Sequence, residues 1–172
     1  IYKPIKDAGK SDDPFKKEIY DMMNEAFVYL HVGQWGKGKY GEDRKNIALM
    51  IKCFLQAFAN QPNPPALLLK TNGADFSHLD KADTIKKIKK EKDKFKSADS
   101  LPNIYLLHGD LTLEQMALLY NLPKIKAMLS CTHGEGFGRP LAEATCCDLP
   151  VIASGWSGQM DFLNPKQSTL IE

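Results

Sequence analysis

Short apolar segments alternate along the chain with segments whose apolar residues recur at helical spacing. The helical pattern is clearest in 46–60, where Ile47, Met50, Phe54 and Ala57 fall on one face. This alternation predicts an α/β fold with a doubly wound, parallel, Rossmann-like sheet and right-handed crossovers. The expected strands are 27–32, 66–71, 104–108, 125–130 and 151–153.

Capping residues and prolines predict where further helices begin. The Asp-Asp-Pro sequence at 12–14 opens a short helix, since Pro is tolerated in the first helical turn. Thr112 is the expected N-cap of a helix over 112–120, with Gln115 at the capping-box position. The remaining expected elements are helices at 81–96 and 139–147, a tight turn at 155–158 before a short helix, and a strand that includes 169–172.

The turns that follow the strands identify the edge of the sheet where a ligand should bind. In a doubly wound sheet, ligands bind outside the carboxyl ends of the strands. The turns after Gly33, His108, Ser130 and Ala153 all lie at that edge. We therefore expect the functional residues to gather there.

The most informative of these turns is 132–144, which reads Thr-His-Gly-Glu-Gly-Phe-Gly-Arg-Pro-Leu-Ala-Glu-Ala. An apolar strand precedes it, and a helix with Pro140 in its first turn follows it. Gly136 and Gly138 let the backbone approach a ligand closely. A glycine-rich turn into a helix N-terminus binds anions, most often phosphate, through free N–H groups and the helix dipole. Two carboxylates, Glu135 and Glu143, frame this turn, with seven residues between them.

Three other motifs are weaker matches to the chain. The dinucleotide-binding fingerprint lacks its third glycine at Arg139, and here the motif follows the fourth strand. The P-loop pattern from Gly33 to Lys39 continues with Tyr40, where Mg²⁺ binding needs Ser or Thr. A glycosidase would need two facing carboxylates, whereas Glu135 and Glu143 come from a single turn. No D-x-D motif follows a strand, so we expect no metal-bound diphosphate.

The sequence from about Phe27 to the end resembles the retaining glycosyltransferases of the GT-B fold, most closely glycosyltransferase family 4 (glycosyl transferases group 1). The resemblance rests on Glu135-Gly136-Phe137-Gly138 through Glu143, followed by 149–153, Leu-Pro-Val-Ile-Ala. It implies that the chain is the donor-binding, C-terminal half of a GT-B architecture. In such an enzyme this half holds a nucleotide-diphosphate sugar with its diphosphate at the glycine-rich turn.

The resemblance also implies roles for individual residues. Glu143 would hold the ribose hydroxyls, and Glu135 would bind hydroxyls of the donor sugar. Lys45 matches the family's diphosphate-binding lysine, so Glu135 and Lys45 are the candidate catalytic residues. The family's arginine after the first strand is replaced by Gln34, and Arg44, Lys37 and Lys39 are the candidates to take over its charge. The other donor-binding candidates are Thr132, Gly136, Phe137, Gly138, Arg139, Ser157 and Gly158.

The same resemblance implies how the chain is organised and what it binds. Residues 1–24 would be an interdomain connection or a leading helix, and 25–172 a nucleotide-sugar-binding domain truncated at both ends relative to the full enzyme. The implied partners are a nucleotide-sugar donor, an N-terminal domain of the same chain, and an acceptor that is a lipid-linked glycan, a polysaccharide or a protein. No cofactor or metal is implied. The alternative functions are an inactive nucleotide-sugar-binding module and a GT-B-type epimerase.

Composition bears on the partners and the location of the protein, and not on its activity. The chain has 172 residues and a net charge of +2, which does not indicate nucleic-acid binding. It shows no signal peptide, and its four cysteines lie in apolar surroundings without a C-x-x-C pair, so we expect buried free thiols and a cytoplasmic location. The helix at 81–96 carries eight lysines, which fits either a solvated face or peripheral contact with anionic lipid.

Overall fold

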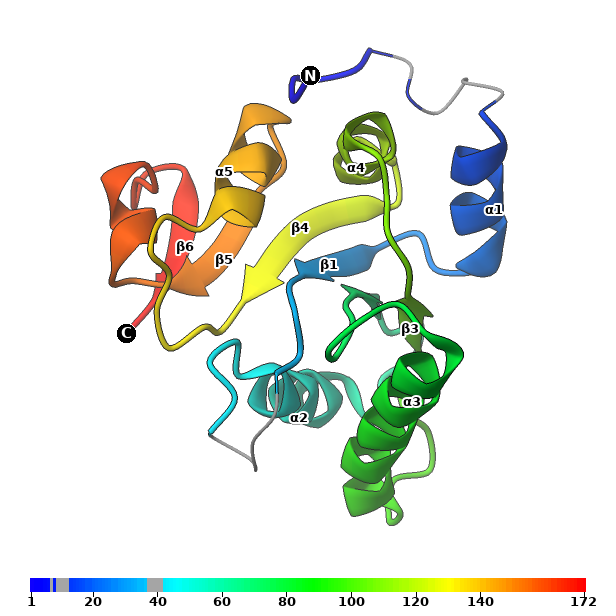
Figure 1. The fold of residues 1–172 in the computed structure, drawn as a ribbon. Coiled ribbons are helices and arrows are strands. Elements are labelled where there is room, and N and C mark those ends of the chain that lie inside the picture. The colour runs from blue at the N-terminus through cyan, green and yellow to red at the C-terminus, as the bar shows by residue number, and fades with distance from the viewer. Residues whose placement is uncertain (7, 9–12, 37–41) are drawn as a thin grey trace.

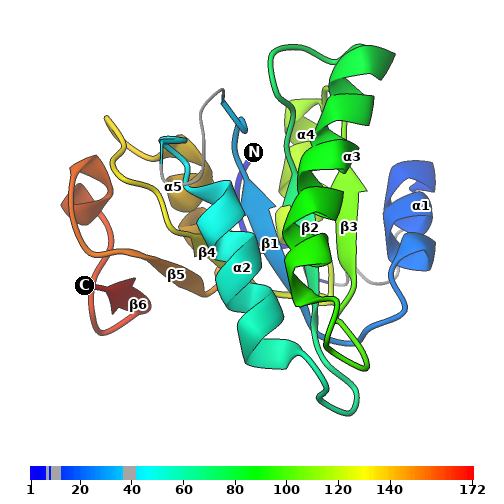
Figure 2. The same cartoon turned by 90° about the horizontal axis from the view of Figure 1, so that it is seen from below.

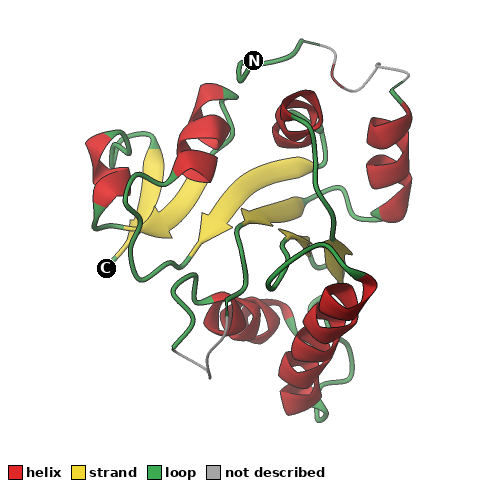
Figure 3. Ribbon diagram, in the orientation of Figure 1, coloured by secondary structure: helices red, strands yellow, loops and turns green. Residues whose placement is uncertain are grey.

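Six parallel strands form the centre of the molecule (Figures 1 and 3). The computed structural model describes residues 1–6, 8, 13–36 and 42–172. The strands hydrogen-bond in the order β3-β2-β1-β4-β5-β6, so the predicted doubly wound Rossmann-like sheet is confirmed. Their bounds are Val28–Val32 for β1, Ala66–Lys70 for β2, Ile104–Leu107 for β3, Ile125–Ser130 for β4, Val151–Ser154 for β5 and Ser168–Ile171 for β6.

Helices cover both faces of the sheet (Figures 1 and 2). On one face lie α1 (Pro14–Met22), α4 (Leu113–Tyr120) and α5 (Arg139–Cys146). On the other lie α2 (Ile47–Phe58) and α3 (His78–Lys92). Short 3-10 turns follow α3 and β5, at η2 (Asp93–Phe95) and η3 (Gly158–Asp161).

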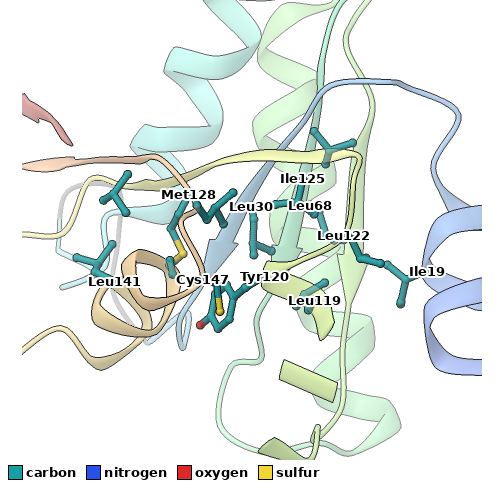
Figure 4. Close-up of a cluster of buried hydrophobic side chains, with 14 of the residues drawn as sticks. Ile19, Leu30, Leu68, Leu119, Tyr120, Leu122, Ile125, Met128, Leu141 and Cys147 are labelled. Atoms are coloured by element: carbon teal, nitrogen blue, oxygen red, sulfur yellow. The ribbon is translucent and has the colours of Figure 1, made fainter. Parts of the chain in front are cut away.

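Strand β2 shows why the sheet has a core on each side. Ala66 and Leu68 belong to the cluster under α1, α4 and α5, and Leu67 and Leu69 belong to the cluster under α2 and α3. All four are 0% exposed. Because successive residues of a strand point to opposite faces, a strand covered on both faces reads as a continuous apolar run. Figure 4 shows the first cluster, which includes Ile19 from α1.

The leading helix is part of this core. Asp13 caps α1 by accepting hydrogen bonds from the N–H groups of Phe15 and Lys16, with Pro14 at the start of the helix. Ile19 is 2% exposed and packs with the residues of α4 and β4. The predicted short helix in this region is confirmed, and its apolar face packs onto the sheet domain.

The capping box of α4 is also confirmed, whereas α3 starts earlier than its lysines suggest. The Thr112 hydroxyl accepts from Gln115 N–H, and the Gln115 side chain accepts from Thr112 N–H. Helix α3 begins at His78, because the Ser77 hydroxyl accepts from Asp80 N–H at 3.1 Å and caps the first turn. The pattern of lysines beginning at Lys81 does not carry this capping signal.

The expectation of four buried thiols is wrong for two of them. All four cysteines are free, but Cys53 and Cys146 are exposed, and Cys131 is half-buried. Cys53 lies on α2 where the helix borders an open apolar groove, and Cys146 lies in the last turn of α5. Apolar sequence neighbours therefore do not bury these side chains, since the sheet covers only one side of each helix.

The strand order positions the functional site. β1 pairs with β4 at Leu30 and Met128, although β2 and β3 lie between them in the sequence. The order of strands therefore reverses direction between β1 and β4, which is where the loops after two neighbouring strands turn to opposite faces. The loop over 33–46 follows β1, and the loop over 131–138 follows β4.

Candidate functional site

The loop after β4 is held in place by the loop after β1. The Thr132 hydroxyl lies 3.1 Å from the carbonyl oxygens of both Arg44 and Gly134, and it accepts from the Gly134 N–H. The His133 N–H donates to the same Arg44 carbonyl at 2.9 Å. Thr132 is 1% exposed, so these bonds are shielded from water. The two loops thus form one unit, and Thr132 joins them.

The turn into α5 requires a glycine at its last position. Gly138 has φ +86°, a backbone conformation that favours glycine, and its carbonyl accepts from the N–H groups of Leu141 and Ala142. In the part of the chain that the structure describes, the N–H groups of Phe137 and Gly138 have no hydrogen-bond acceptor. These unpaired donors at a helix N-terminus are the feature that binds anions elsewhere.

The turn after β5 packs directly onto this loop. The Ser157 hydroxyl donates to the Glu135 carbonyl at 2.9 Å, and the Gly158 N–H donates to it at 3.0 Å. A Cβ at Gly158 would lie 2.0 Å from the Gly136 carbonyl oxygen, so only glycine fits there. Ser157 and Gly158 therefore lie beside the candidate site, and in this structure the Gly158 donor is used to hold the loop.

The structure brings Glu135 together with both basic residues that precede α2. The Lys45 ammonium forms an ion pair with Glu135 Oε1, and Arg44 Nη1 lies 2.9 Å from Glu135 Oε2. Arg44 Nη1 also donates to the Gly134 carbonyl at 2.9 Å. The side chains of Lys45 and Glu135 are 10% and 9% exposed, whereas that of Arg44 is 60% exposed. A shielded ion pair with an exposed second cation thus lies at the topological switch point.

These two cations determine the charge of Glu135. Partial burial raises the pKa of a carboxyl group, but the hydrogen bonds from Lys45 and Arg44 outweigh burial and hold the pKa of Glu135 below its ordinary value. Glu135 is therefore ionised at neutral pH. An ionised carboxylate offers only acceptors, which suits it to the hydroxyl groups of a sugar.

Asp43 explains why Lys45 is placed so firmly. Helix α2 has Asn46 at its N-cap with φ +54°, and the Asn46 side chain makes no capping bond. Asp43 caps the helix instead, because its carboxylate accepts from the N–H group of Ile47. The same carboxylate also accepts from the N–H group of Gly36. Asp43 is 4% exposed, and it is not among the site residues that the sequence predicts. The only available signal was an acid three residues before the N-cap.

The Glu143 side chain is less exposed to solvent than its place near the start of α5 suggests. Its carboxylate accepts from Arg139 Nε at 2.6 Å and from the buried Tyr120 hydroxyl at 3.0 Å. Its side chain is 10% exposed. Burial, reinforced by the neighbouring Glu143 carboxylate, raises the pKa of Tyr120 far above its ordinary value, so Tyr120 remains a hydrogen-bond donor. Tyr120 thus contacts a candidate site residue, and no feature of the sequence predicts this contact.

Gln34 points to a different loop from the one that carries Glu135. Its side-chain amide donates to the Gly73 carbonyl at 2.7 Å, in the loop after β2. Two of the expected substitutes for the arginine, Lys37 and Lys39, lie outside the described residues. The same holds for Gly38 and Tyr40 of the P-loop-like pattern. Of the three candidates to replace the family's arginine, Arg44 is the one that the structure places on Glu135.

Two further observations on the described residues concern a metal site and an open groove beside the candidate site. No group of three or more His, Cys, Asp or Glu side chains among the described residues is arranged to hold a metal ion. A groove of about 710 Å³ lies along α2 and next to Thr132, but its lining is largely apolar, including Phe54, Leu129, Ile152 and Trp156. Such a lining does not suit a diphosphate. Among the described residues, no helix is long and apolar enough to cross a membrane.

Comparisons with known proteins agree with this architecture. Neither a protein-family model nor a curated protein sequence matched the chain. One similar solved structure is the C-terminal domain of the glycosyl transferase group 1 family protein LpcC from Francisella tularensis. It has a TM-score of 0.63 and 13% identity, and the match covers 100% of this chain and 77% of that chain.

Two further similar structures are sucrose-phosphate synthase from Thermosynechococcus elongatus and Anabaena Alr3699/HepE in complex with UDP and glucose. The first has a TM-score of 0.64 at 18% identity, and the match covers 99% of this chain and 36% of that chain. The second has a TM-score of 0.60 at 17% identity, and the match covers 94% of this chain and 39% of that chain. The chain thus spans little more than a third of these two proteins. Its fold is the Rossmann-like fold of GT-B C-terminal domains, as the sequence predicts.

Proposed function

We propose that this chain is the donor-binding domain of a retaining glycosyltransferase, which transfers a hexose from a nucleotide-diphosphate sugar to an acceptor. The observation that carries the proposal is the cluster of Lys45, Arg44 and Glu135 beside the N-terminus of α5. It combines two cations and free N–H donors for a diphosphate with an ionised acceptor for sugar hydroxyls. Two structures of Anabaena Alr3699/HepE, one with UDP and glucose and one with UDP-glucose, have this fold in part of their chain and support the proposal.

In this proposal the residues act mainly on the leaving group. Lys45, Arg44 and the N–H groups at Phe137 and Gly138 take up the negative charge that develops on the diphosphate as the glycosidic bond breaks. Interactions that strengthen at that stage lower the barrier. Because side chains and the helix N-terminus supply this charge, we propose a reaction that requires neither a metal ion nor a cofactor.

Glu135 and Glu143 would hold the two sugars of the donor. A carboxylate oxygen accepts from hydroxyl groups, and two oxygens can engage a vicinal diol. Glu143, fixed by Arg139 and Tyr120, is proposed to bind the ribose. Glu135, in the loop, is proposed to bind the transferred sugar and to contact it as a catalytic residue. Gly136, Ser157 and Gly158 would shape the wall beside that sugar.

A catalytically inactive nucleotide-sugar-binding module is the alternative, and Gln34 is the observation that favours it. An arginine at this position would add a cation next to the diphosphate, whereas the Gln34 amide donates to the Gly73 carbonyl. Arg44 supplies a cation from a different position. The two functions differ in the full-length enzyme, where only the transferase releases free nucleoside diphosphate in the presence of an acceptor.

A membrane surface is a further proposed partner. Leu79 and Ile85 of α3 are 80% and 48% exposed, among exposed lysines that include Lys81 and Lys89. Exposed apolar and cationic side chains on one helix suit the interface of an anionic bilayer. We propose that the protein is cytoplasmic and contacts such a surface. Co-sedimentation with phosphatidylglycerol vesicles but not with phosphatidylcholine vesicles is the expected result, and equal sedimentation with both would contradict it.

The proposal is tested first by ligand binding to the 172-residue chain. In a thermal-shift screen of ADP, GDP and UDP, at least one diphosphate should raise the melting temperature, with or without a chelator. The chain alone should transfer no sugar, because we propose that the catalytic cleft also needs the N-terminal domain implied by the resemblance. The absence of a shift with every nucleoside diphosphate, confirmed by calorimetry, would refute donor binding.

A further inference from the structure

A buried histidine lies beneath the Lys45–Glu135 ion pair, in a position that the proposed chemistry does not yet explain. His31 is near the carboxyl end of β1 and is 0% exposed. Its Nδ1 atom lies 2.9 Å from the Leu129 carbonyl oxygen of the neighbouring strand β4. A carbonyl oxygen only accepts, so Nδ1 carries the proton and Nε2 presents a lone pair.

That lone pair has no donor among the described residues. Buried polar atoms are usually hydrogen-bonded, so an unpaired one calls for an explanation, of which a functional role is one. Burial, with a further contribution from the charge of Lys45, lowers the pKa of His31 to about 4. The imidazole is therefore neutral at physiological pH and keeps an acceptor at Nε2.

Gly33 shows what this acceptor faces. A Cβ built on Gly33 would lie 3.1 Å from His31 Nε2 and 3.3 Å from Lys45 Cε. The two atoms therefore border the same small space, which is open because residue 33 has no side chain. The Lys45 ammonium is bonded to Cε, so rotation about the Cδ–Cε bond changes the position of the ammonium while Cε stays beside this space.

We propose that His31 is a positioning residue, whose Nε2 accepts a hydrogen bond from the Lys45 ammonium when a nucleotide-sugar donor occupies the site. This inference rests on the proposed function. As sugar hydroxyls take the Glu135 carboxylate and the diphosphate takes one Lys45 N–H, the ammonium loses its present partner. His31 supplies a neutral acceptor from below and directs the remaining N–H groups toward the diphosphate. An ammonium has three donors, enough for both.

A double-mutant cycle in the 172-residue chain tests this coupling. The variants are His31→Leu, Lys45→Met and the double variant, titrated calorimetrically with ADP-glucose, GDP-glucose and UDP-glucose. We expect His31→Leu to weaken binding of the nucleotide sugar about tenfold, which is the size of one hydrogen bond to a charged group. In the Lys45→Met background the same change should cost less than about twofold. Equal losses in both backgrounds would show a packing role and overturn the inference.

A conservative variant distinguishes a role of His31 in positioning Lys45 from a role of His31 in packing alone. His31→Gln keeps an acceptor near the position of Nε2, so it should bind within about threefold of the wild type. His78→Gln, on the exposed surface of α3, is the matched control and should bind as the wild type does. A Gln variant as weak as the Leu variant would contradict the role of Nε2.

A spectroscopic measurement needs no substitution and remains available if His31→Leu does not fold. With ¹⁵N-labelled histidine, the Nε2 resonance of His31 should shift when a nucleotide sugar saturates the site, while Nδ1 stays protonated. An unchanged Nε2 resonance at saturation would overturn the inference. If the wild type binds the nucleotide sugar and Lys45→Met weakens this binding but His31→Leu does not, this inference alone fails. If the wild type binds neither a nucleotide sugar nor a nucleoside diphosphate, the proposed function fails with it.

Discussion

Glu135 and Glu143 belong to one turn and helix, yet the structure holds them in opposite ways. The partners of Glu135, Lys45 and Arg44, come from a loop about 90 residues earlier in the chain. One partner of Glu143, Arg139, is one turn away on the same helix, and the other is the buried Tyr120 hydroxyl of α4. Glu135 thus joins two loops, whereas Glu143 is fixed within a packed pair of helices.

The difference suggests different behaviour when a ligand binds. The Lys45–Glu135 pair consists of one group proposed to hold phosphate and one proposed to hold sugar, so a donor should separate them. The Glu143 carboxylate is already aligned by two donors and should add ribose hydroxyls without leaving either. The first region would therefore reorganise on binding, and the second would remain as it is.

The largest expected effect is a pH dependence of stability in the Glu135 region. The pKa of His31 is about 4 in the folded protein and about 6.5 in the unfolded chain, so below pH 6.5 the unfolded state binds more protons. Stability should therefore fall as pH decreases from 6.5 towards 4, at up to about 1.4 kcal/mol per pH unit and by about 3 kcal/mol in all.

Urea unfolding at several pH values between 7 and 5 measures this effect above the titration range of most carboxylates. His31→Gln should remove the slope due to His31, while His78→Gln, which is exposed, should leave it. An unchanged slope in His31→Gln would mean that another group is responsible for the titration.

Next in size is the loss of the Lys45 charge. Lys45→Met should weaken binding of a nucleoside diphosphate by about 1.5–3 kcal/mol, because a charge-assisted hydrogen bond in a shielded site is removed. This corresponds to about tenfold or more in Kd. Calorimetry should show normal affinity for Lys89→Met, an exposed lysine of α3. Normal binding by Lys45→Met, or loss of wild-type binding in chelator, would contradict the role of Lys45.

A smaller effect is expected where the Glu143 region is fixed. Tyr120→Phe removes the hydroxyl that donates to Glu143 and should lower the free energy of unfolding by about 1–2 kcal/mol. It should also weaken diphosphate binding a few-fold, because Glu143 loses one of the bonds that align it. Tyr105→Phe is the control, since its hydroxyl donates to Glu25, which precedes β1 and lies outside the candidate site. Equal binding losses in both variants would argue against a special role for Tyr120.

The sequence predicted the sheet because each strand is a short apolar run between helical patterns. β2 is the clearest case, since Leu67, Leu68 and Leu69 are all buried, on alternating faces of the sheet. No polar residue therefore interrupts the apolar run that predicts a strand. The capping box at Thr112 also followed from local chemistry. Local signals of this kind do not depend on the rest of the fold.

The contacts across the site could not be predicted in the same way. The pairing of Lys45 with Glu135, the capping of α2 by Asp43 and the position of His31 all depend on how two loops meet at the switch point. A lone histidine in an apolar strand gives no indication of which loop lies above it. The sequence identified the residue types at this edge of the sheet, and the structure supplied their partners.

The most direct test of donor binding compares the two glutamates with two ligands. A nucleoside diphosphate and its sugar conjugate are titrated calorimetrically into the wild type, Glu135→Ala and Glu143→Ala. Glu143→Ala should weaken both ligands by about 1.5–3 kcal/mol, because both carry ribose, whereas Glu135→Ala should weaken only the sugar conjugate. Equal losses for both ligands in Glu135→Ala would show that Glu135 only supports its loop, and would contradict the donor site proposed here.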